Sequence, residues 1–380
     1  MRFSPYWPIS GFYFFYFAAM GVLMPYLGLY LQSLGFCPRQ IGAVLAMLYA
    51  TKIVAPVAWG WLADRRGERA GLIRMAAALS IVAFVGVYFP AGGTFPWLML
   101  VMAVFGFFWN AALPHVEAIT LDHLGDHTHR YGRIRLWGSI GFILTVLLFG
   151  GLLAGYDVRV VLHGTLALLV GILLSALFLS DHGGHLPHRE PGPLGEILRQ
   201  PRVLALFGAC FLMLMSHAPH YAFYSIYLDE YLYDPTTIGQ LWALGVCAEV
   251  AFFLIMPWVL KRVGLRGLFL GSFAVAGPRW LLVALFPSVL WVQAFSQLLH
   301  AVTFGVYHTV AILLIHRFFV GNHQGQGQAL YNSVSFGAGY AMGALGGGFL
   351  WFHFGGEFTY LVAMGVTALA FGVAWRWVRE

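Results

Sequence analysis

Residues 110–142 read NAALPHVEAITLDHLGDHTHRYGRIRLWGSIGF and join two hydrophobic segments through a short polar hairpin. Glu117 lies in the first segment and Arg135 early in the second, although an ionised side chain costs roughly 3 kcal/mol at the bilayer centre. Asn110, Pro114 and Glu117 follow one another at spacings of four and three, so a helix places them on one face. We therefore expect a buried acid–base pair that lines a polar path, or else a structural ion pair that locks two helices.

The composition of the chain is that of an integral membrane protein. Of its 380 residues 60% are hydrophobic and 9% are charged, whereas soluble domains carry about 25% charged residues. Twelve apolar runs, each near the roughly 20 residues that cross a bilayer, are centred near residues 20, 50, 80, 108, 144, 170, 215, 248, 276, 304, 338 and 366. The sequence therefore predicts an all-α membrane protein with twelve transmembrane helices.

The basic residues predict the orientation of these helices. The formal net charge of +6 is spread over many short loops, which argues against a nucleic-acid-binding surface. If the N-terminus is cytoplasmic, only Arg39 and Arg159 fall in external loops, while Lys52, Arg135 and Arg279 lie inside spans. Because cytoplasmic loops are enriched in Lys and Arg, we expect both termini in the cytoplasm. Three scattered cysteines predict neither a disulfide framework nor a metal site.

The loop between the second and third spans has the most specific local motif, GWLADRRGER at residues 60–69. It resembles the G-x-L-a-D-r-x-G-r-[kr] signature of the major facilitator superfamily, in which the acid and a helix end of span eleven latch one conformation. We expect Gly60 to allow close approach of helices and Asp64 to sit against the positive end of another helix. Glu68 stands where the superfamily prefers a base, so an ordinary basic loop is the alternative. The resemblance implies a conformational latch made by Gly60, Asp64, Arg65, Gly67 and Arg69.

The longest polar stretch, residues 181–201, lies near the middle of the chain. We interpret it as a cytoplasmic linker between an N-terminal six-helix bundle at residues 1–180 and a C-terminal six-helix bundle at residues 202–380. Residues 257–266 repeat the loop motif in a degraded form that lacks the acid, as expected of two symmetry-related halves with substrate between them. Span eleven has six glycines between residues 337 and 348, which favours a helix that packs closely and moves.

Polar side chains inside spans two and seven are candidates for substrate binding. Lys52 lies about ten residues before the loop, so its ammonium group does not easily snorkel to the membrane surface, although snorkelling is the alternative. Span seven places His217, His220 and Tyr224 on one stripe at spacings of three and four. Two imidazoles are unusual in a lipid-facing stripe, so a ligand surface competes with helix packing or an interfacial aromatic belt.

The second half of the chain contains its own acid and base. Glu249 lies in span eight, Arg279 in span nine, and span ten adds His300 on a broad polar face. Because imidazole exchanges protons near neutral pH, His300 is a candidate for a titrating group or for a hydrogen-bond donor to substrate. A packing histidine is the alternative.

Nearly the whole chain resembles lactose permease and its relatives. The matching stretches are NAALPHVEA at residues 110–118, YGRIRLWG at residues 131–138, Ala248 with Glu249, Arg279, and Leu299 with His300. The chain is most similar to the phenylpropionic acid permeases, through RLWGS at residues 135–139, YAFYSIY at residues 221–227 and IGQLWALGVCAEV at residues 238–250. This resemblance implies the major facilitator fold, with two pseudo-symmetric six-helix bundles and transport by alternating access.

The resemblance also implies roles for single residues. In lactose permease the residues that match Glu117 and Arg135 bind sugar, and those that match Glu249, Arg279 and His300 couple sugar to the proton. We therefore expect proton coupling at Glu117, Glu249 and His300. Together with the candidates above, the expected substrate-binding residues are Arg135, Arg279, Lys52, Asn110, Phe142, His217, His220 and Tyr224.

The chain departs from lactose permease at informative positions. Thr303 replaces a carboxylate, Phe142 replaces a sugar-stacking tryptophan, and Gln297 replaces a lysine, while Lys52 is an extra base. Loss of the tryptophan disfavours galactoside binding. An added cation beside phenyl and tyrosyl surface favours an aromatic carboxylate, because the cation pairs with the charged end of the substrate.

We therefore expect a proton-coupled symporter of the bacterial inner membrane that imports a small organic anion such as 3-phenylpropionate. A saccharide or nucleoside proton symporter of the same fold is the alternative. The sequence has no H-E-x-x-H cluster and no nucleophile elbow, so we do not expect an enzyme. We expect a monomer in the lipid bilayer, with protons and a small molecule as partners and with neither a cofactor nor a nucleic acid.

Overall fold

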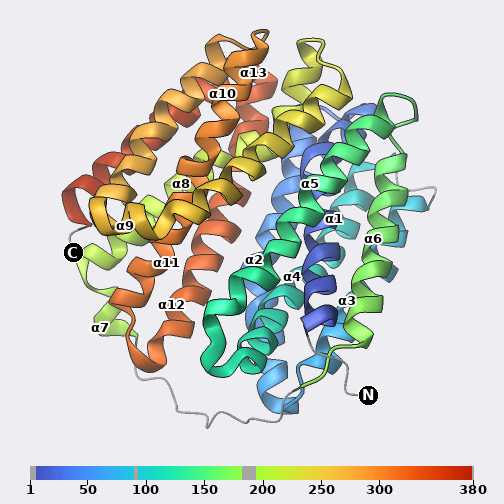
Figure 1. Cartoon of the computed structure of the whole chain (residues 1–380). Coiled ribbons are helices and arrows are strands. Elements are labelled where there is room, and N and C mark those ends of the chain that lie inside the picture. The colour runs from blue at the N-terminus through green and yellow to red at the C-terminus, as the bar shows by residue number, and fades with distance from the viewer. Residues whose placement is uncertain (1–5, 90–92, 182–193, 379–380) are drawn as a thin grey trace. The chain divides into compact units, whose positions relative to one another are not determined.

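A computed structural model describes residues 6–89, 93–181 and 194–378, and Figure 1 shows that these residues form helices. Ten of the described helices are long and apolar enough to cross a membrane. Two of the ten, Pro235–Leu285 with 51 residues and Gln324–Trp377 with 54 residues, are too long for one crossing. At 1.5 Å per residue they would extend about 77 Å and 81 Å, whereas a bilayer core is about 30 Å thick. The predicted all-α membrane fold is confirmed.

Each of the two long helices is interrupted by one glycine in a left-handed conformation. Gly264 has a φ of 75° and Gly355 a φ of 82°, values that residues with a Cβ rarely adopt. Gly264 lies between the predicted spans centred on residues 248 and 276, and Gly355 lies between those centred on residues 338 and 366. The ten helices thus correspond to the predicted apolar runs, while the number of twelve crossings stays a prediction.

The described helices follow one another in the order of the chain. In the first half the elements are α1 (Tyr6–Ser33), α2 (Pro38–Arg66), α3 (Ala70–Val85), η1 (Gly86–Tyr88), α4 (Phe95–Leu124), η3 (Gly125–Arg130), α5 (Tyr131–Leu153) and α6 (Val160–Leu177). In the second half they are α7 (Gly195–Leu198), α8 (Pro201–Glu230), α9 (Pro235–Leu285), α10 (Leu290–His300), η4 (Ala301–Val306), α11 (Tyr307–Phe318), η5 (Gly321–His323), α12 (Gln324–Tyr331), η6 (Asn332–Gly339) and α13 (Tyr340–Trp377).

The helices pack into two compact units. The first contains α1, α3 to α6, most of α2, and Asp234–Ala243 at the start of α9. The second contains α7, α8, α10 to α13, most of α9, and Cys37–Ala46 at the start of α2. The sequence did not predict that the first residues of α2 belong to the second unit and the first residues of α9 to the first unit. The predicted bundle boundaries stay a prediction, since residues 182–193 of the expected linker lie outside the described residues.

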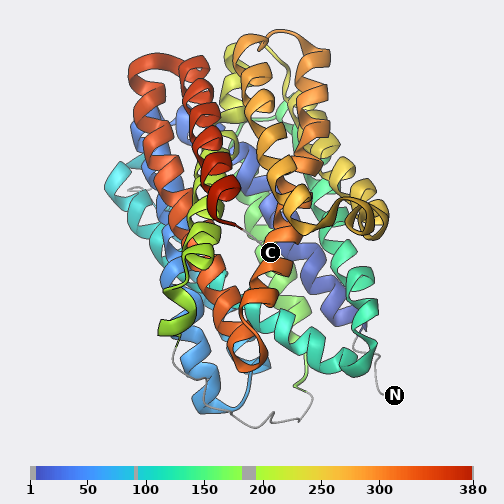
Figure 2. The same cartoon turned by 90° about the vertical axis from the view of Figure 1, so that its left-hand side faces the viewer.

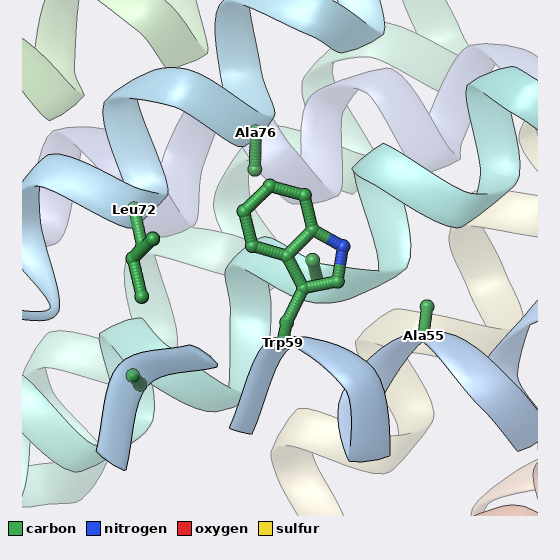
Figure 3. Packing of buried hydrophobic residues seen from close by; sticks show 6 residues of the cluster. Ala55, Trp59, Leu72 and Ala76 are labelled. Atoms are coloured by element: carbon green, nitrogen blue, oxygen red, sulfur yellow. The ribbon is translucent and has the colours of Figure 1, made fainter. Parts of the chain in front are cut away.

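In the first unit α1 packs against α5 and α6, and α3 packs against α4 and α6 (Figures 1 and 2). The crossing of α1 and α5 is close because a Cβ at Gly141 would lie 2.3 Å from the backbone oxygen of Phe14. A cluster of small side chains surrounds the buried Trp59, and Figure 3 shows its indole ring beside Ala76. The cluster consists of Ala55, Trp59, Ala63, Leu72, Ala76 and Ala111. Small residues therefore permit close helix packing without a polar core.

In the second unit α8 packs along η6 and α13. Glycines four residues apart face residues four apart on α8: a Cβ at Gly339 would lie 2.9 Å from the oxygen of Phe211, and a Cβ at Gly343 would lie 2.3 Å from that of Met215. The prediction that the glycine-rich span eleven packs closely is therefore confirmed. The prediction that it moves is not tested by these contacts.

Candidate substrate and proton site

Arg279 of α9 is fully buried in the second unit, with 0% of its surface exposed. Its Nη1 donates to His300 Nδ1 and to Thr303 Oγ1, both at 2.9 Å, and its Nη2 donates to His220 Nε2 at 3.3 Å. In the described part of the chain its Nε has no hydrogen-bond partner, and no carboxylate contacts the guanidinium directly. A buried cation is thus held by three neutral acceptors, and its Nε–H is left without an acceptor among the described residues.

The contact with Arg279 determines the tautomer of His300. A guanidinium can only donate, so His300 Nδ1 accepts and the ring proton is on Nε2. His300 Nε2 lies 2.8 Å from Glu249 Oε1 and donates to this carboxylate. Glu249 is therefore connected to Arg279 through one imidazole ring. The structure brings together the acid, base and histidine that the sequence singled out in the second half.

His217 and Thr303 extend this network from the other side of Arg279. His217 Nδ1 lies 2.9 Å from the backbone oxygen of Met213, which can only accept, so this nitrogen carries the proton. His217 Nε2 then accepts from Thr303 Oγ1 at 3.4 Å. The Thr303 hydroxyl accepts from Arg279 and donates to His217, and it thus joins the two where lactose permease has a carboxylate.

The predicted stripe of α8 faces this network. The ring of Tyr224 lies 4.3 Å from that of His220, and its hydroxyl donates to Gln293 Oε1 of α10 at 3.2 Å. His217 packs edge-on against Trp280, with ring centroids 4.8 Å apart. The stripe therefore lies in the interior of the second unit. These contacts suit both of the expected roles, ligand surface and helix packing.

The predicted acid and base of the first unit lie near each other without forming a direct ion pair. Glu117 of α4 lies near Tyr131 at the start of α5 and near Arg135. No ion pair within 4 Å joins Glu117 and Arg135 among the residues that the structure describes. The guanidinium of Arg135 instead lies over the ring of Phe17, 3.8 Å from its centroid, and 5.7 Å from that of Tyr13. The two groups share one polar region, in which Tyr131 lies near the acid and aromatic rings contact the base.

Three other predicted binding residues of the first unit are held by local contacts. Asn110 donates to Thr51 Oγ1 at 2.8 Å and thereby connects α4 to α2. The ammonium group of Lys52 lies 5.8 Å from the ring centroid of Tyr49. Phe142 is buried in α5, with 8% of its surface exposed. The structure does not bring these three residues into contact with one another.

The loop with the GWLADRRGER motif is anchored within the first unit by two aspartates outside the motif. Arg69 Nη1 pairs with Asp122 Oδ2 of α4 at 2.6 Å. The carboxylate of Asp181 accepts the backbone N–H of Arg69 and of Ala70 at 3.1 Å and thus caps α3. Gly67, with a φ of 66°, ends α2 in the left-handed conformation that favours glycine. Asp122 and Asp181 were missed, since the sequence does not show which distant acids meet the loop.

The prediction that Gly60 allows a close helix approach is wrong. No atom lies within 4 Å of the position that a Cβ at Gly60 would take. Helices α2 and α4 instead approach closely at Gly106, where a Cβ would lie 2.6 Å from Thr51 Oγ1. Arg65 stacks on Trp61, with its guanidinium 3.9 Å from the ring centroid. The latch between Asp64 and span eleven stays a prediction.

Tyr131 is a further site residue that sequence reasoning did not single out. It precedes Arg135 by four residues, so a helix places both on one face, and it lies in the quoted segment at residues 110–142. That spacing could have identified it as a partner of Glu117 or Arg135. Helical spacing alone could not decide which of these two residues is the partner of Tyr131.

In each unit, long apolar helices surround a guanidinium, a carboxylate and hydroxyl or imidazole groups at positions where a soluble core would be apolar. The chain matches the MFS_1 like family over residues 6–362 and belongs to it. It is therefore a multi-pass membrane transporter of the major facilitator superfamily and not an enzyme.

Known relatives cover almost the whole chain. It is 28% identical over 362 residues to the "Probable 3-phenylpropionic acid transporter" of Escherichia coli (strain K12), with 93% of each chain covered. It is 27% identical over 347 residues to the maltose permease of Geobacillus stearothermophilus, with 89% of this chain and 86% of the permease covered. A mutant of the nucleoside transporter NupG superposes with a TM-score of 0.86 at 17% identity, covering 99% of this chain and 100% of its own. A bacterial homologue of ferroportin gives a TM-score of 0.72 at 16% identity with full coverage of both chains. At these identities the two structures support the fold alone.

Proposed function

We propose that the protein is a proton-coupled symporter that imports a small aromatic carboxylate, such as 3-phenylpropionate, by alternating access. The observation that carries this proposal is Arg279, a fully buried cation whose hydrogen bonds go to neutral acceptors. A buried charge is costly unless it is paired, and a substrate carboxylate would supply the missing counter-charge. The similarity to a phenylpropionic acid transporter supports a carboxylate over an uncharged substrate.

The geometry around His300 suggests how proton and substrate are coupled. A substrate carboxylate that accepts the Nη1 hydrogen bond of Arg279 would draw the guanidinium away from His300 Nδ1. The freed Nδ1 lone pair then binds a proton, and the resulting imidazolium is paired with Glu249 through Nε2. When the substrate leaves, Arg279 returns to Nδ1 and displaces the proton. One anion and one proton therefore cross together.

In the first unit we assign the corresponding roles to Arg135 as a second cation for the substrate and to Glu117 as a second proton acceptor. Glu117 forms no ion pair within 4 Å among the described residues, so it can bind a proton without breaking one. The remaining substrate-contacting residues in this proposal are Lys52, Asn110, Phe142, His217, His220 and Tyr224. The proposal includes a monomer in the bacterial inner membrane with both termini in the cytoplasm, as the distribution of Lys and Arg favours.

A saccharide or nucleoside proton symporter is the second candidate. It is favoured by the 27% identity to a maltose permease and by the hydrogen-bonding groups of Tyr224 and Gln293, which suit hydroxyl ligands. In that case Arg279 would donate to a neutral oxygen and would remain a buried cation without an anionic partner. The buried cation Arg279 therefore favours a carboxylate substrate over a saccharide or a nucleoside.

Counterflow in proteoliposomes distinguishes the two candidates. Vesicles loaded with unlabelled 3-phenylpropionate, maltose or uridine are diluted into the same labelled compound, and transient accumulation is followed. We expect accumulation of 3-phenylpropionate alone, and its loss in an Arg279→Gln variant. Accumulation of maltose or uridine but not of 3-phenylpropionate would replace the proposal by the second candidate.

A further inference from the structure

Two π-helical segments interrupt the helices of the second unit beside the Arg279 network. They are η4, which directly follows His300, and η6, which precedes α13. π-helical turns are rare and concentrate at functional sites, because the extra residue changes the direction in which side chains point. Phe304 of η4 and Phe336 of η6 touch edge to face, with ring centroids 6.3 Å apart at 88°. Each π segment thus supplies one ring to a shared contact.

These two rings belong to a closed set of four, which we call the aromatic box: Tyr221, Phe304, Phe336 and Tyr340. Its remaining centroid distances are 6.1 Å for Tyr221 to Phe304, 5.7 Å for Phe336 to Tyr340 and 5.4 Å for Tyr340 to Tyr221. The two tyrosines are buried, whereas Phe304 and Phe336 are half-buried. The box therefore has two buried walls and two rings that protein atoms do not fully cover.

The aromatic box is continuous with the proposed anion site. The ring of Phe304 stacks on that of His300 at 5.2 Å and 8°, and His300 Nδ1 accepts from Arg279. The hydroxyl of Tyr221 lies 3.3 Å from His300 Nε2. One imidazole ring therefore separates the guanidinium from the first phenyl ring. A molecule that bridges Arg279 and Phe304 would need a short spacer between its carboxylate and its aryl ring. Its ring would meet an edge of Phe304, because the Phe304 ring is stacked with those of His300 and His308.

We propose that Phe304 and Phe336 form the subsite for the aryl ring of the substrate and set its preference for aromatic over aliphatic carboxylates. This inference rests on the proposed function, and it adds two residues that the predicted substrate set did not contain. A contact between two aromatic rings is more favourable than an aliphatic contact that buries the same area. Two such contacts should therefore give a preference for aromatic over aliphatic substrates on the order of tenfold. The substrate class is a carboxylate whose phenyl ring is separated from the charge by a flexible chain.

The test compares Phe304→Leu and Phe336→Leu, which keep apolar volume but remove a ring. Unlabelled 3-phenylpropionate and 3-cyclohexylpropionate compete with labelled 3-phenylpropionate for counterflow in proteoliposomes. The wild type should prefer the aromatic competitor by about tenfold, and each variant should lower this preference to about threefold while its apparent affinity for 3-cyclohexylpropionate stays about the same. Phe349→Leu is the control, since this α13 ring is 50% exposed and lies outside the box.

Two outcomes separate this inference from the proposed function. Leucine variants that retain the wild-type aromatic preference overturn the aryl subsite, even if 3-phenylpropionate is transported. A wild type that transports no aromatic or aliphatic carboxylate refutes the proposed function instead. Phe304→Tyr and Phe336→Tyr retain the ring and should retain the preference. If a leucine variant unfolds in detergent, methionine at the same position replaces it in the same comparison.

Discussion

Arg279 and a proton compete for the same lone pair of His300. While the guanidinium donates to Nδ1, this nitrogen cannot hold a proton, and the ring donates to Glu249 through Nε2. Any ligand that attracts Arg279 therefore makes His300 available for protonation. In the proposed mechanism this competition needs no carboxylate at the position of Thr303 in span ten.

We predict that Arg279→Gln weakens binding of 3-phenylpropionate by about 10- to 100-fold, because hydrogen bonds to charged groups contribute about 1.5–3 kcal/mol. Competition in proteoliposomes measures the change. The variant should remain folded, since it removes a buried charge rather than a hydrophobic contact. Arg262→Gln is the control, because Arg262 stacks on Trp258 at 4.0 Å, outside the network. Unchanged binding in Arg279→Gln would show that the anion binds elsewhere.

We predict that His300→Asn separates exchange of substrate from its coupling to protons. Asparagine keeps hydrogen-bonding groups near Arg279 and Glu249 but cannot take up a proton near neutral pH. Counterflow of 3-phenylpropionate should continue within about tenfold of the wild-type rate, while uptake driven by a pH gradient should be lost. If the gradient still drives concentrative uptake in this variant, the proton site is not His300.

At the scale of single residues, the sequence predicts which residue types form the candidate site, but it predicts only some of their partners. Glu249, Arg279 and His300 stood out because charged and imidazole groups are rare in membrane spans, and the structure places them in one network. Glu117 and Arg135 stood out for the same reason, yet no direct ion pair joins them among the described residues, and Tyr131 lies near the acid. Helical spacing gives the face on which a side chain lies but not its nearest partner on another helix.

At the scale of helices, close packing depends on particular glycines. We predict that Gly141→Ala lowers the stability of the first unit by about 1–3 kcal/mol, because its Cβ would lie 2.3 Å from a backbone oxygen of α1 that cannot rotate away. Thermal unfolding in detergent measures the effect. Gly151→Ala in the same helix is the control, since no atom lies within 4 Å of its Cβ, and alanine should there be neutral or stabilising. Equal stability of the two variants would contradict this packing.

The start of α9 has a pH-dependent cap. Asp234 accepts hydrogen bonds from the Thr237 hydroxyl at 2.6 Å and from its backbone N–H at 3.0 Å, and these bonds hold the pKa of the Asp234 carboxyl below its usual value. Since the folded-state pKa is lowered, the cap contributes above the unfolded-state pKa near 4 and is lost as pH falls through the folded-state value. We therefore predict that Asp234→Ala costs about 1 kcal/mol at pH 7.

Unfolding midpoints of wild type and Asp234→Ala, measured in detergent between pH 7 and pH 3, test this cap. The difference between the two proteins should be constant down to about pH 4 and should shrink below it. A difference that grows on acidification would mean that another group near Asp234 is responsible.

The π segments η4 and η6 were not predictable from the sequence. An extra residue in one helical turn has no compositional signature, and Phe304 and Phe336 look like ordinary members of apolar runs. Gly264 and Gly355, in contrast, lie between predicted spans, where a left-handed residue is expected. The sequence therefore predicts where one helix ends and the next begins, but it does not predict the π-helical segments inside helices.

At the scale of the whole molecule, the positions of the apolar segments follow from hydropathy along the sequence, while the number of twelve crossings stays a prediction. A membrane-spanning helix satisfies its backbone hydrogen bonds within the helix and exposes apolar side chains to lipid. Hydropathy therefore identifies candidate crossings. The exchange of Cys37–Ala46 and Asp234–Ala243 between the two units was not visible, since hydropathy does not show which helices pair. The resemblance to lactose permease supplied the architecture that composition could not.

The most direct test of the proposed symport is proton movement during substrate entry in proteoliposomes. On addition of 3-phenylpropionate, wild-type vesicles should take up one proton per anion, alkalinise a weakly buffered medium and show no dependence on membrane potential, because the pair carries no net charge. Protein-free vesicles and vesicles with Arg279→Gln correct for diffusion of the free acid through lipid. Protein-dependent uptake without proton movement, or uptake driven by membrane potential, would contradict the exchange between Arg279 and a proton at His300.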